Sequence, residues 1–190
     1  LPVLTDRELV DQFVAGDQSA FTQLMQNHED RIFGLCLRML RDRTKALDAT
    51  QETFLTLYRK ADKYHGKSAF STWLYRVAVN TCYDQMRKEK RKKADALPAH
   101  LDPVDPHVTD EMRAVELRPD IEAALATLQP EFRSAVILVD MEGHSLETAA
   151  EMLEVPIGTV KSRVFRGRRI LASNLGNLSN PSATPRDDRE

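Results

Sequence analysis

The chain has 190 residues, of which 42% are hydrophobic and 6% aromatic, and its 27 basic and 29 acidic side chains leave a net charge of −2. This length suits one medium domain or two small ones, and the scarcity of glycine and aromatic residues favours an all-α fold over a large sheet. No apolar run approaches the roughly 18 residues of a membrane span and no signal-peptide pattern opens the chain, which together predict a cytoplasmic protein.

Four helices are predicted in the first half of the chain from the spacing of their apolar residues. The first, within "TDRELVDQFVAG", begins at a capping box formed by Thr5 and Glu8 and ends at Gly16. The others cover residues 19–41, 44–61 and 71–93. The expected buried stripe of the second helix is Phe21, Leu24, Met25, Ile32, Leu35, Cys36 and Met39, and that of the third is Leu47, Phe54, Leu57, Tyr58 and Ala61.

The fourth helix carries the only tryptophan of the chain, and helical spacing puts it on the polar face. Leu74, Tyr75, Ala78, Val79, Cys82 and Met86 gather on one side, and Trp73, Arg76, Asn80, Tyr83, Asp84 and Arg87 gather on the other. We therefore expect an exposed Trp73, with half burial under a neighbouring loop or helix as the alternative. The helix ends in "RKEKRKK", residues 87–93, with six bases and one acid.

The helical pattern stops after residue 93, where three prolines fall within residues 98–106. Residues 94–117 carry six acids and one base and are predicted to form a flexible linker between two helical domains, residues 1–93 and 118–176. In the second domain helices are expected at 119–128, 130–142, 146–153 and 157–174, before a disordered tail at 177–190. Basic segments at 87–93 and 161–169 suggest nucleic acid bound at two places.

Residues 145–169, "SLETAAEMLEVPIGTVKSRVFRGRR", match a helix-turn-helix, with Ser145 as a cap and with Ala150, Val155 and Val160 at the packing positions. The outer side of its second helix offers groups that suit the major groove of DNA, and an ordinary basic surface helix is the alternative. Gly167 is expected to weaken this helix by about 1 kcal/mol relative to alanine. The outward residues are Ser162, Phe165, Arg166 and Arg169, flanked by Lys161, Arg168, Thr159 and Arg163, and the buried stripe is Ile157, Val160, Val164, Gly167 and Leu171.

Cysteine and histidine give no sign of a metal centre. Cys36 and Cys82 are expected to be separate core thiols, with a redox pair as the alternative. The five histidines lack metal-ligand spacing and no phosphate-cradling glycine loop occurs, so neither a metal nor another cofactor is predicted.

Three segments together resemble the extracytoplasmic-function (ECF, group 4) branch of the sigma-70 initiation factors of bacterial RNA polymerase. They are "DATQETFLTLYR" at 48–59, "FSTWLYRVAVNTCYD" at 70–84 and "PIGTVKSRVFRGRR" at 156–169, and the resemblance extends from about Thr5 to Leu175. It implies an initiation factor, not an enzyme, that binds core RNA polymerase, recognises the −35 and −10 promoter elements and assists promoter opening.

The resemblance also implies a surface for each DNA element. The second domain would read the −35 duplex with Lys161, Ser162, Phe165 and Arg166, while Thr159, Arg163, Arg168 and Arg169 would mainly contact phosphates. In the first domain the loop 64–71 would receive a base flipped out of the melted non-template strand, because single-stranded bases stack on exposed aromatic rings. The −10 surface would consist of Phe70, Ser71, Trp73, Arg76, Asn80, Tyr83, Asp84 and Arg87.

Protein partners follow from the same resemblance. The β′ clamp helices of the polymerase would contact Asp48, Gln51, Glu52, Leu55 and Arg59, where a leucine is ringed by polar groups, although composition alone favours a solvated face. The β-flap tip would meet an apolar surface that includes Leu128, Phe132 and Leu138, and an anti-sigma factor is expected. The acidic linker would occupy a basic channel of the polymerase, or act as a plain tether.

Two other functions remain open from the residues alone. A stand-alone helix-turn-helix regulator explains residues 119–175 but leaves the Trp73 face and the segment 48–54 unused, and it would bind duplex DNA tightly without polymerase. A nuclease or nucleotidyltransferase would need a metal-dependent activity of the purified chain, and no carboxylate cluster with a local partner supports it.

Overall fold

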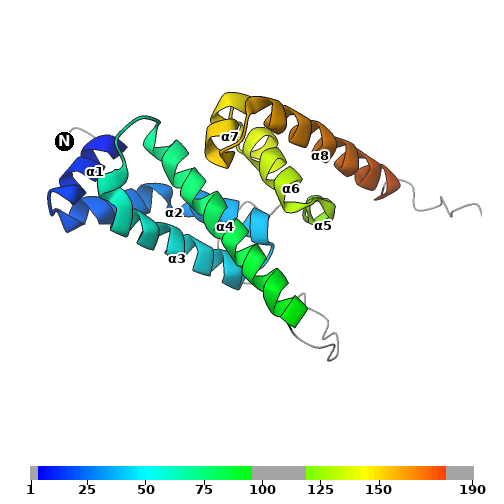
Figure 1. The fold of residues 1–190 in the computed structure, drawn as a ribbon, viewed down its shortest axis with the longest axis horizontal. Coiled ribbons are helices and arrows are strands. Elements are labelled where there is room, and N and C mark those ends of the chain that lie inside the picture. The colour runs from blue at the N-terminus through cyan, green and yellow to red at the C-terminus, as the bar shows by residue number, and fades with distance from the viewer. Residues whose placement is uncertain (1–3, 96–118, 179–190) are drawn as a thin grey trace, which may run out of the picture. The chain divides into compact units, whose positions relative to one another are not determined.

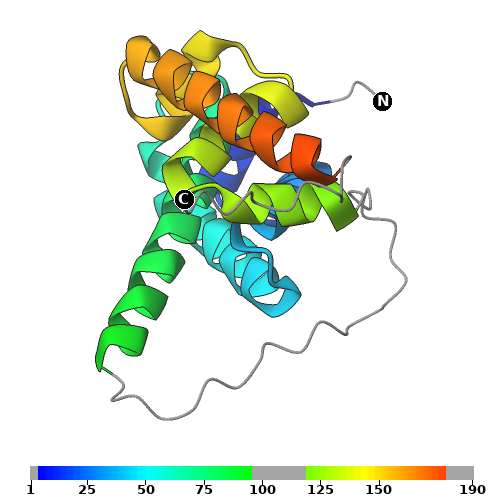
Figure 2. The same cartoon turned by 90° about the vertical axis from the view of Figure 1, so that its right-hand side faces the viewer.

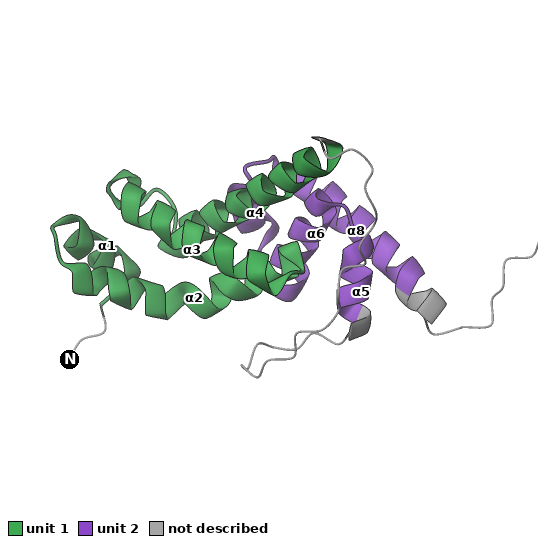
Figure 3. Cartoon of the chain, turned by 90° about the horizontal axis from the view of Figure 1, so that it is seen from below, with its two compact units in different colours: residues 1–116 green, residues 117–190 purple. Residues whose placement is uncertain are grey.

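The computed structural model describes residues 4–95 and 119–178, and the chain divides into two compact units, residues 1–116 and 117–190 (Figure 3). All regular structure in the described ranges is helical, which confirms the predicted all-α class. Most of the predicted linker, residues 96–117, and of the predicted tail, residues 179–190, lies outside the described residues.

Unit 1 is a helical bundle in which α2, α3 and α4 pack on one another and α1 packs on α2 (Figure 1). The ends of the helices lie close to those predicted. The C-terminal part of α4, which carries the basic run, extends beyond α2 and α3 (Figures 1 and 2). The elements are α1 (Asp6–Val14), α2 (Gln18–Leu40), α3 (Arg43–Lys60), a 3₁₀ turn (Ala61–Lys63) and α4 (Phe70–Asp95).

The predicted capping box at the start of α1 is confirmed. The Glu8 backbone N–H donates to the Thr5 hydroxyl at 3.3 Å, and the Thr5 backbone N–H donates to Glu8 Oε2 at 2.8 Å. The Thr5 backbone N–H, followed by the Thr5 hydroxyl, donates to the Glu8 carboxylate and holds the pKa of Glu8 below its ordinary value. The side chains of Asp17 and Asp42 accept from the backbone N–H groups of Ser19 and Lys45 and cap α2 and α3, so local sequence explains where these helices begin.

The buried stripe of α3 differs from the one predicted. Leu47 and Tyr58 are 45% and 48% exposed, whereas the small residues Ala46 and Ala49 are fully buried together with Leu57. Small side chains let α3 lie close to its neighbours, and the remaining buried polar group, the Thr53 hydroxyl, donates to the Ala49 carbonyl oxygen at 2.7 Å. The prediction that Leu47 and Tyr58 belong to the buried face of α3 was therefore wrong.

The two cysteines are buried in the core of unit 1, as predicted, but they also contact each other. The hydrogen bond with the Cys36 thiol, followed by burial, raises the pKa of Cys82. Both thiols are free. None of the helices in the described ranges has an apolar stretch long enough to cross a bilayer.

Unit 2 contains the helix-turn-helix and two helices that support it. α6 and α8 pack most closely, and Leu128, Ile137 and Leu138 are among the most deeply buried side chains. The proposed apolar surface of this unit is thus partly wrong, since Leu128 is 2% exposed and Leu138 is not exposed at all. The elements are α5 (Pro119–Thr127), α6 (Pro130–Val136), a π-helical turn (Ile137–Met141), α7 (Leu146–Leu153) and α8 (Ile157–Leu178).

Gly167 has a packing role that the sequence did not indicate. A Cβ atom on Gly167 would lie 2.6 Å from Val136 Cγ2 and 3.5 Å from the Phe132 carbonyl oxygen, so only glycine fits where α8 crosses α6. Gly167 therefore lowers helix propensity, as expected, but it lets α8 and α6 approach each other closely.

Candidate nucleic-acid and polymerase interfaces

The helix-turn-helix is formed by α7, a tight turn and α8. The Ser145 hydroxyl accepts from the Thr148 backbone N–H at 3.1 Å and caps α7 as predicted, and α7 ends at Glu154 in the left-handed conformation with φ 54°. The turn closes where the Val155 backbone N–H donates to the Ala150 carbonyl oxygen at 3.2 Å. Val160 and Val164 then anchor α8 in the core, which fixes the side of α8 that faces outward.

The outward side of α8 agrees with the predicted DNA-facing set. Phe165 is 63% exposed, more than any other large apolar side chain in the described part of the chain. The Arg169 guanidinium lies over the Phe165 ring, 5.9 Å from its centroid, so a cation and an apolar ring are presented together. Of the remaining predicted residues, Lys161, Ser162, Arg166 and Arg168 are exposed, and Thr159 and Arg163 are half-buried.

Arg168 differs from the other arginines of α8. Its Nε and Nη2 donate to Asp140 Oδ2 and Oδ1 at 3.0 and 2.5 Å, and this hydrogen bonding raises the pKa of Arg168. The pair joins α8 to the π-helical turn, so the Arg168 guanidinium is engaged within unit 2.

A groove of about 360 Å³ lies between α6 and α8. Phe132 and Ile170 provide apolar lining and Ser173 a hydroxyl, while Arg166 and Arg169 carry its positive charge. The groove therefore continues the basic outer side of α8 towards α6.

Trp73 is not exposed, so the expectation of an exposed tryptophan is wrong and the burial alternative holds. Its exposed fraction is 9%, and its ring packs against Tyr64 and Phe70 with centroids 5.9 and 6.1 Å away. Phe70 is itself only 3% exposed. Helical spacing placed Trp73 correctly on α4, but the loop before α4 folds over that face.

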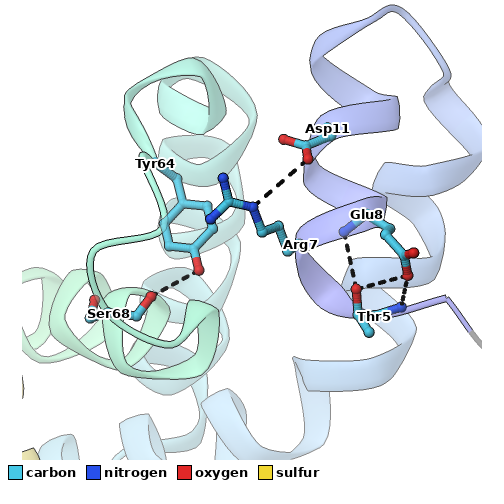
Figure 4. A network of polar contacts seen from close by, with 6 residues as sticks. All are labelled: Thr5, Arg7, Glu8, Asp11, Tyr64 and Ser68. Atoms are coloured by element: carbon cyan, nitrogen blue, oxygen red, sulfur yellow. Dashed lines mark hydrogen bonds and ion pairs between the residues drawn. The ribbon is translucent and has the colours of Figure 1, made fainter.

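The loop between the 3₁₀ turn and α4 is closed by its own polar contacts. The Tyr64 hydroxyl donates to the Ser68 carbonyl oxygen at 2.9 Å (Figure 4). Gly66, between them in the sequence, adopts φ 68°. Partial burial raises the pKa of Tyr64, with Arg7 acting in the opposite direction. The predicted base-binding loop is thus ordered around an aromatic floor of Tyr64, Phe70 and Trp73.

The rest of the predicted −10 surface lies on the accessible side of α4. Asn80, Asp84 and Arg87 are exposed, and Asp84 forms an ion pair with Arg87 one turn later. The half-buried members of the set are Ser71, Arg76 and Tyr83. The structure thus brings six of the eight predicted residues to the surface and puts Phe70 and Trp73 beneath it.

The predicted polymerase-binding residues of α3 are all exposed. Leu55 is 46% exposed, and Arg59 Nη1 lies 3.6 Å from Glu52 Oε1 beside it, with Asp48 and Gln51 also at the surface. Leu47, eight residues before Leu55, is 45% exposed, so α3 presents two exposed leucines. Sequence reasoning missed Leu47 because every large apolar residue of α3 except Leu55 was assigned to the core.

Comparison with known proteins agrees with this geometry. The family models described as Sigma-70 region 2 and Sigma-70, region 4 match residues 24–92 and 118–171. The chain is 39% identical to the ECF RNA polymerase sigma factor SigM of Mycobacterium tuberculosis, over 92% of this chain and 87% of SigM. The chain belongs to the ECF family of sigma factors.

A second relative and a solved structure support the same assignment. The ECF sigma-E factor of Haemophilus influenzae is 34% identical over 92% of this chain and 97% of its own length. The sigma factor RpoE of Bartonella quintana, solved with the anti-sigma factor NepR, superposes with a TM-score of 0.69 at 29% identity and covers 82% of this chain and 96% of its own. The recognition of the ECF sigma family from three sequence segments is thereby confirmed.

Within residues 4–95 and 119–178, no three histidine, cysteine or acidic side chains cluster in a way that would hold a metal ion.

Proposed function

We propose that this ECF sigma factor divides promoter recognition between its two units. Unit 2 reads the −35 duplex through α8, and unit 1 binds the β′ clamp helices through α3 and holds the melted −10 strand along α4. The observation that carries this proposal is the exposed Phe165, flanked by arginines on the outer side of a helix-turn-helix in a chain of this family.

The outer side of α8 supports major-groove readout. Arg166 and Lys161 can bind guanine edges, and Phe165 can contact a thymine methyl group or a sugar. Arg169 and Arg163 supply phosphate contacts, which fix the register of the helix on the duplex. Arg168 contributes least, because its guanidinium would have to leave Asp140 before it could bind DNA.

Unit 1 receives the melted strand on a surface that an aromatic floor supports from below. Asn80 can bind a base edge and Arg76 and Arg87 can bind phosphates. Trp73 acts by supporting the loop 64–69, since its ring is buried and offers no free face for a base. The loop 64–69 binds the flipped base, and its contacts with that base offset the free-energy cost of unstacking it.

Polymerase binding rests on α3. The half-exposed Leu55 forms an apolar centre, and Asp48, Gln51 and Glu52 form a polar rim, as protein interfaces typically do. In unit 2, Phe132 is the member of the suggested flap-binding surface that lines a groove, so the β-flap contact involves Phe132, while Arg166 and Arg169 of the same groove bind DNA.

An anti-sigma factor is the second protein partner that we propose. The structurally similar Bartonella RpoE was solved in complex with the anti-sigma factor NepR. Such a partner would hold this factor inactive in the cytoplasm, and catalysis of phosphodiester bond formation would belong to the polymerase.

Three substitutions separate the three surfaces. Leu55→Glu should prevent comigration with core polymerase in size-exclusion chromatography, and Arg166→Ala should weaken −35 duplex binding by the holoenzyme, by about 1–3 kcal/mol for one bidentate base contact. Asn80→Ala should leave both intact and reduce permanganate-detected strand opening at −10. If Leu55→Glu left core binding unchanged, or Asn80→Ala left opening unchanged, that part of the division of labour would be wrong.

A further inference from the structure

Arg7 of α1 extends over the loop that precedes α4, although the two lie far apart in the sequence. A Cβ atom on Gly66 would lie 1.8 Å from Arg7 Nη1 and 2.8 Å from its Cζ, so the guanidinium occupies the space that a side chain at position 66 would fill. Figure 4 shows the Arg7 side chain reaching from α1 to Tyr64, whose hydroxyl closes the loop on Ser68. Arg7 is therefore part of the surface of this loop.

The guanidinium of Arg7 is weakly engaged by the acidic residues of its own helix. Its Nε lies 4.0 Å from Asp11 Oδ2, the long limit of an ion pair, and the two side chains are 62% and 72% exposed. Exposed ion pairs of this kind contribute little free energy, so Asp11 holds the Arg7 guanidinium only weakly. Asp6 instead faces His28 at 3.0 Å, and Glu8 is bonded to Thr5 in the capping box.

Two lysines lie on this loop. Lys63 and Lys67 are exposed on either side of Gly66, as is Asp62 before them, while Trp73 and Tyr64 form the floor beneath. Cationic side chains can bind the phosphates of a single strand while the aromatic residues support the loop that holds its base. Duplex DNA would not present a base to this loop.

We propose that Arg7 binds a backbone phosphate of the melted non-template strand, next to the base held by the loop 64–69. This inference rests on the proposed −10 function of unit 1 and extends the binding site to α1. It adds a residue that lies before residue 24, where the match to Sigma-70 region 2 begins. Asp11 then acts as a competitor of the phosphate for Arg7.

The test uses holoenzyme made from the full chain and core polymerase. The probe is a fluorescent single strand that carries the non-template −10 sequence of a promoter transcribed by this holoenzyme. Its dissociation constant is measured by anisotropy between 0.1 and about 1 M salt, with thermal unfolding of each variant alongside. The variants are Arg7→Gln, Arg7→Lys, Asp11→Asn, Asn80→Ala and Arg41→Asn. Arg41 ends α2 with φ 58°, a conformation that asparagine tolerates, so Arg41→Asn removes one charge at the end of α2 remote from α1.

A lost phosphate contact on a single strand lowers the slope of log Kd against log salt by about 0.7, equivalent to about five-fold in affinity over a ten-fold salt range. Arg7→Gln should show this loss without a change in melting temperature, Arg7→Lys should restore most of it, and Asp11→Asn should tighten binding about two-fold. Asn80→Ala should weaken binding with an unchanged slope.

Two results would overturn the inference. In the first, Arg7→Gln behaves like Arg41→Asn while Asn80→Ala still weakens binding, so that the −10 function stands without Arg7. In the second, Arg7→Gln lowers the melting temperature and Arg7→Lys fails to restore the salt slope, which would make Arg7 a packing residue. If neither Arg7→Gln nor Asn80→Ala changed binding, the proposed −10 surface would fall together with the inference.

Discussion

Gly167→Ala tests whether the recognition helix depends on close contact with α6. In an isolated helix this change would stabilise by about 1 kcal/mol, because alanine has the higher helix propensity. Here the new Cβ would lie 2.6 Å from Val136 Cγ2, whereas carbon atoms in contact prefer about 3.5–4.0 Å. Valine has a stiff, branched side chain that cannot swing away, so Val136 or the whole of α8 must shift.

Overpacking of this kind typically costs about 1–3 kcal/mol, which outweighs the gain in helix propensity. We expect Gly167→Ala to lower the free energy of unfolding of unit 2 by about 1 kcal/mol. Gly158→Ala is the matched control in the same helix, because nothing lies within 4 Å of its Cβ position. That variant should be more stable than the parent by about 0.4–1 kcal/mol.

Hydrogen exchange read by mass spectrometry is the suitable assay for this pair. All tyrosines and the tryptophan lie at positions 58–83, so their fluorescence reports on unit 1 alone and serves as an internal control. Peptides from α6 and α8 should exchange about five-fold faster in Gly167→Ala, since 1.4 kcal/mol corresponds to ten-fold. Slower exchange than in the parent, as expected for Gly158→Ala, would refute the packing role of Gly167.

Further predictions concern the three surfaces. Trp73→Ala should cost unit 1 about 3–5 kcal/mol in urea unfolding and Trp73→Phe much less; equal, small costs would mean that the ring does not support the loop. Leu55→Glu should abolish core binding while changing the free energy of unfolding by at most about 0.5 kcal/mol. Leu57→Ala, at a fully buried position, should lower that free energy by about 2–5 kcal/mol. A destabilised Leu55→Glu would contradict the surface assignment. Phe165→Ala should change the free energy of unfolding by at most about 0.5 kcal/mol. In a gel-shift titration of the holoenzyme it should weaken −35 binding more than Arg168→Ala does, and the reverse order would count against the assigned roles.

Features encoded by neighbouring residues could be predicted from the sequence. The capping box of Thr5 and Glu8 and the cap at Ser145 depend on atoms a few residues apart, and the structure confirms both. The exposure of Phe165 followed from the turn spacing and from the apolar stripe of Val160 and Val164. Local spacing is sufficient where one helix face clearly packs and the other clearly does not.

Contacts between distant segments could not be predicted. A helical wheel describes the faces of α4 but not the loop that covers one of them, so the burial of Trp73 by Tyr64 was missed. The fit of Gly167 against Val136 and the meeting of Cys36 with Cys82 depend on how helices approach each other. The same holds for Arg7, whose relation to Gly66 depends on the docking of α1 beside the 3₁₀ turn.

The most direct test of the central claim is run-off transcription by bacterial core polymerase on a promoter library, with and without this protein. We predict transcripts from a subset of promoters that appear only when the protein is present and that disappear with Leu55→Glu. The account would be contradicted if no transcript depended on the protein while the protein alone bound duplex DNA tightly, because a stand-alone regulator would then explain unit 2 and the roles given to unit 1 would be wrong.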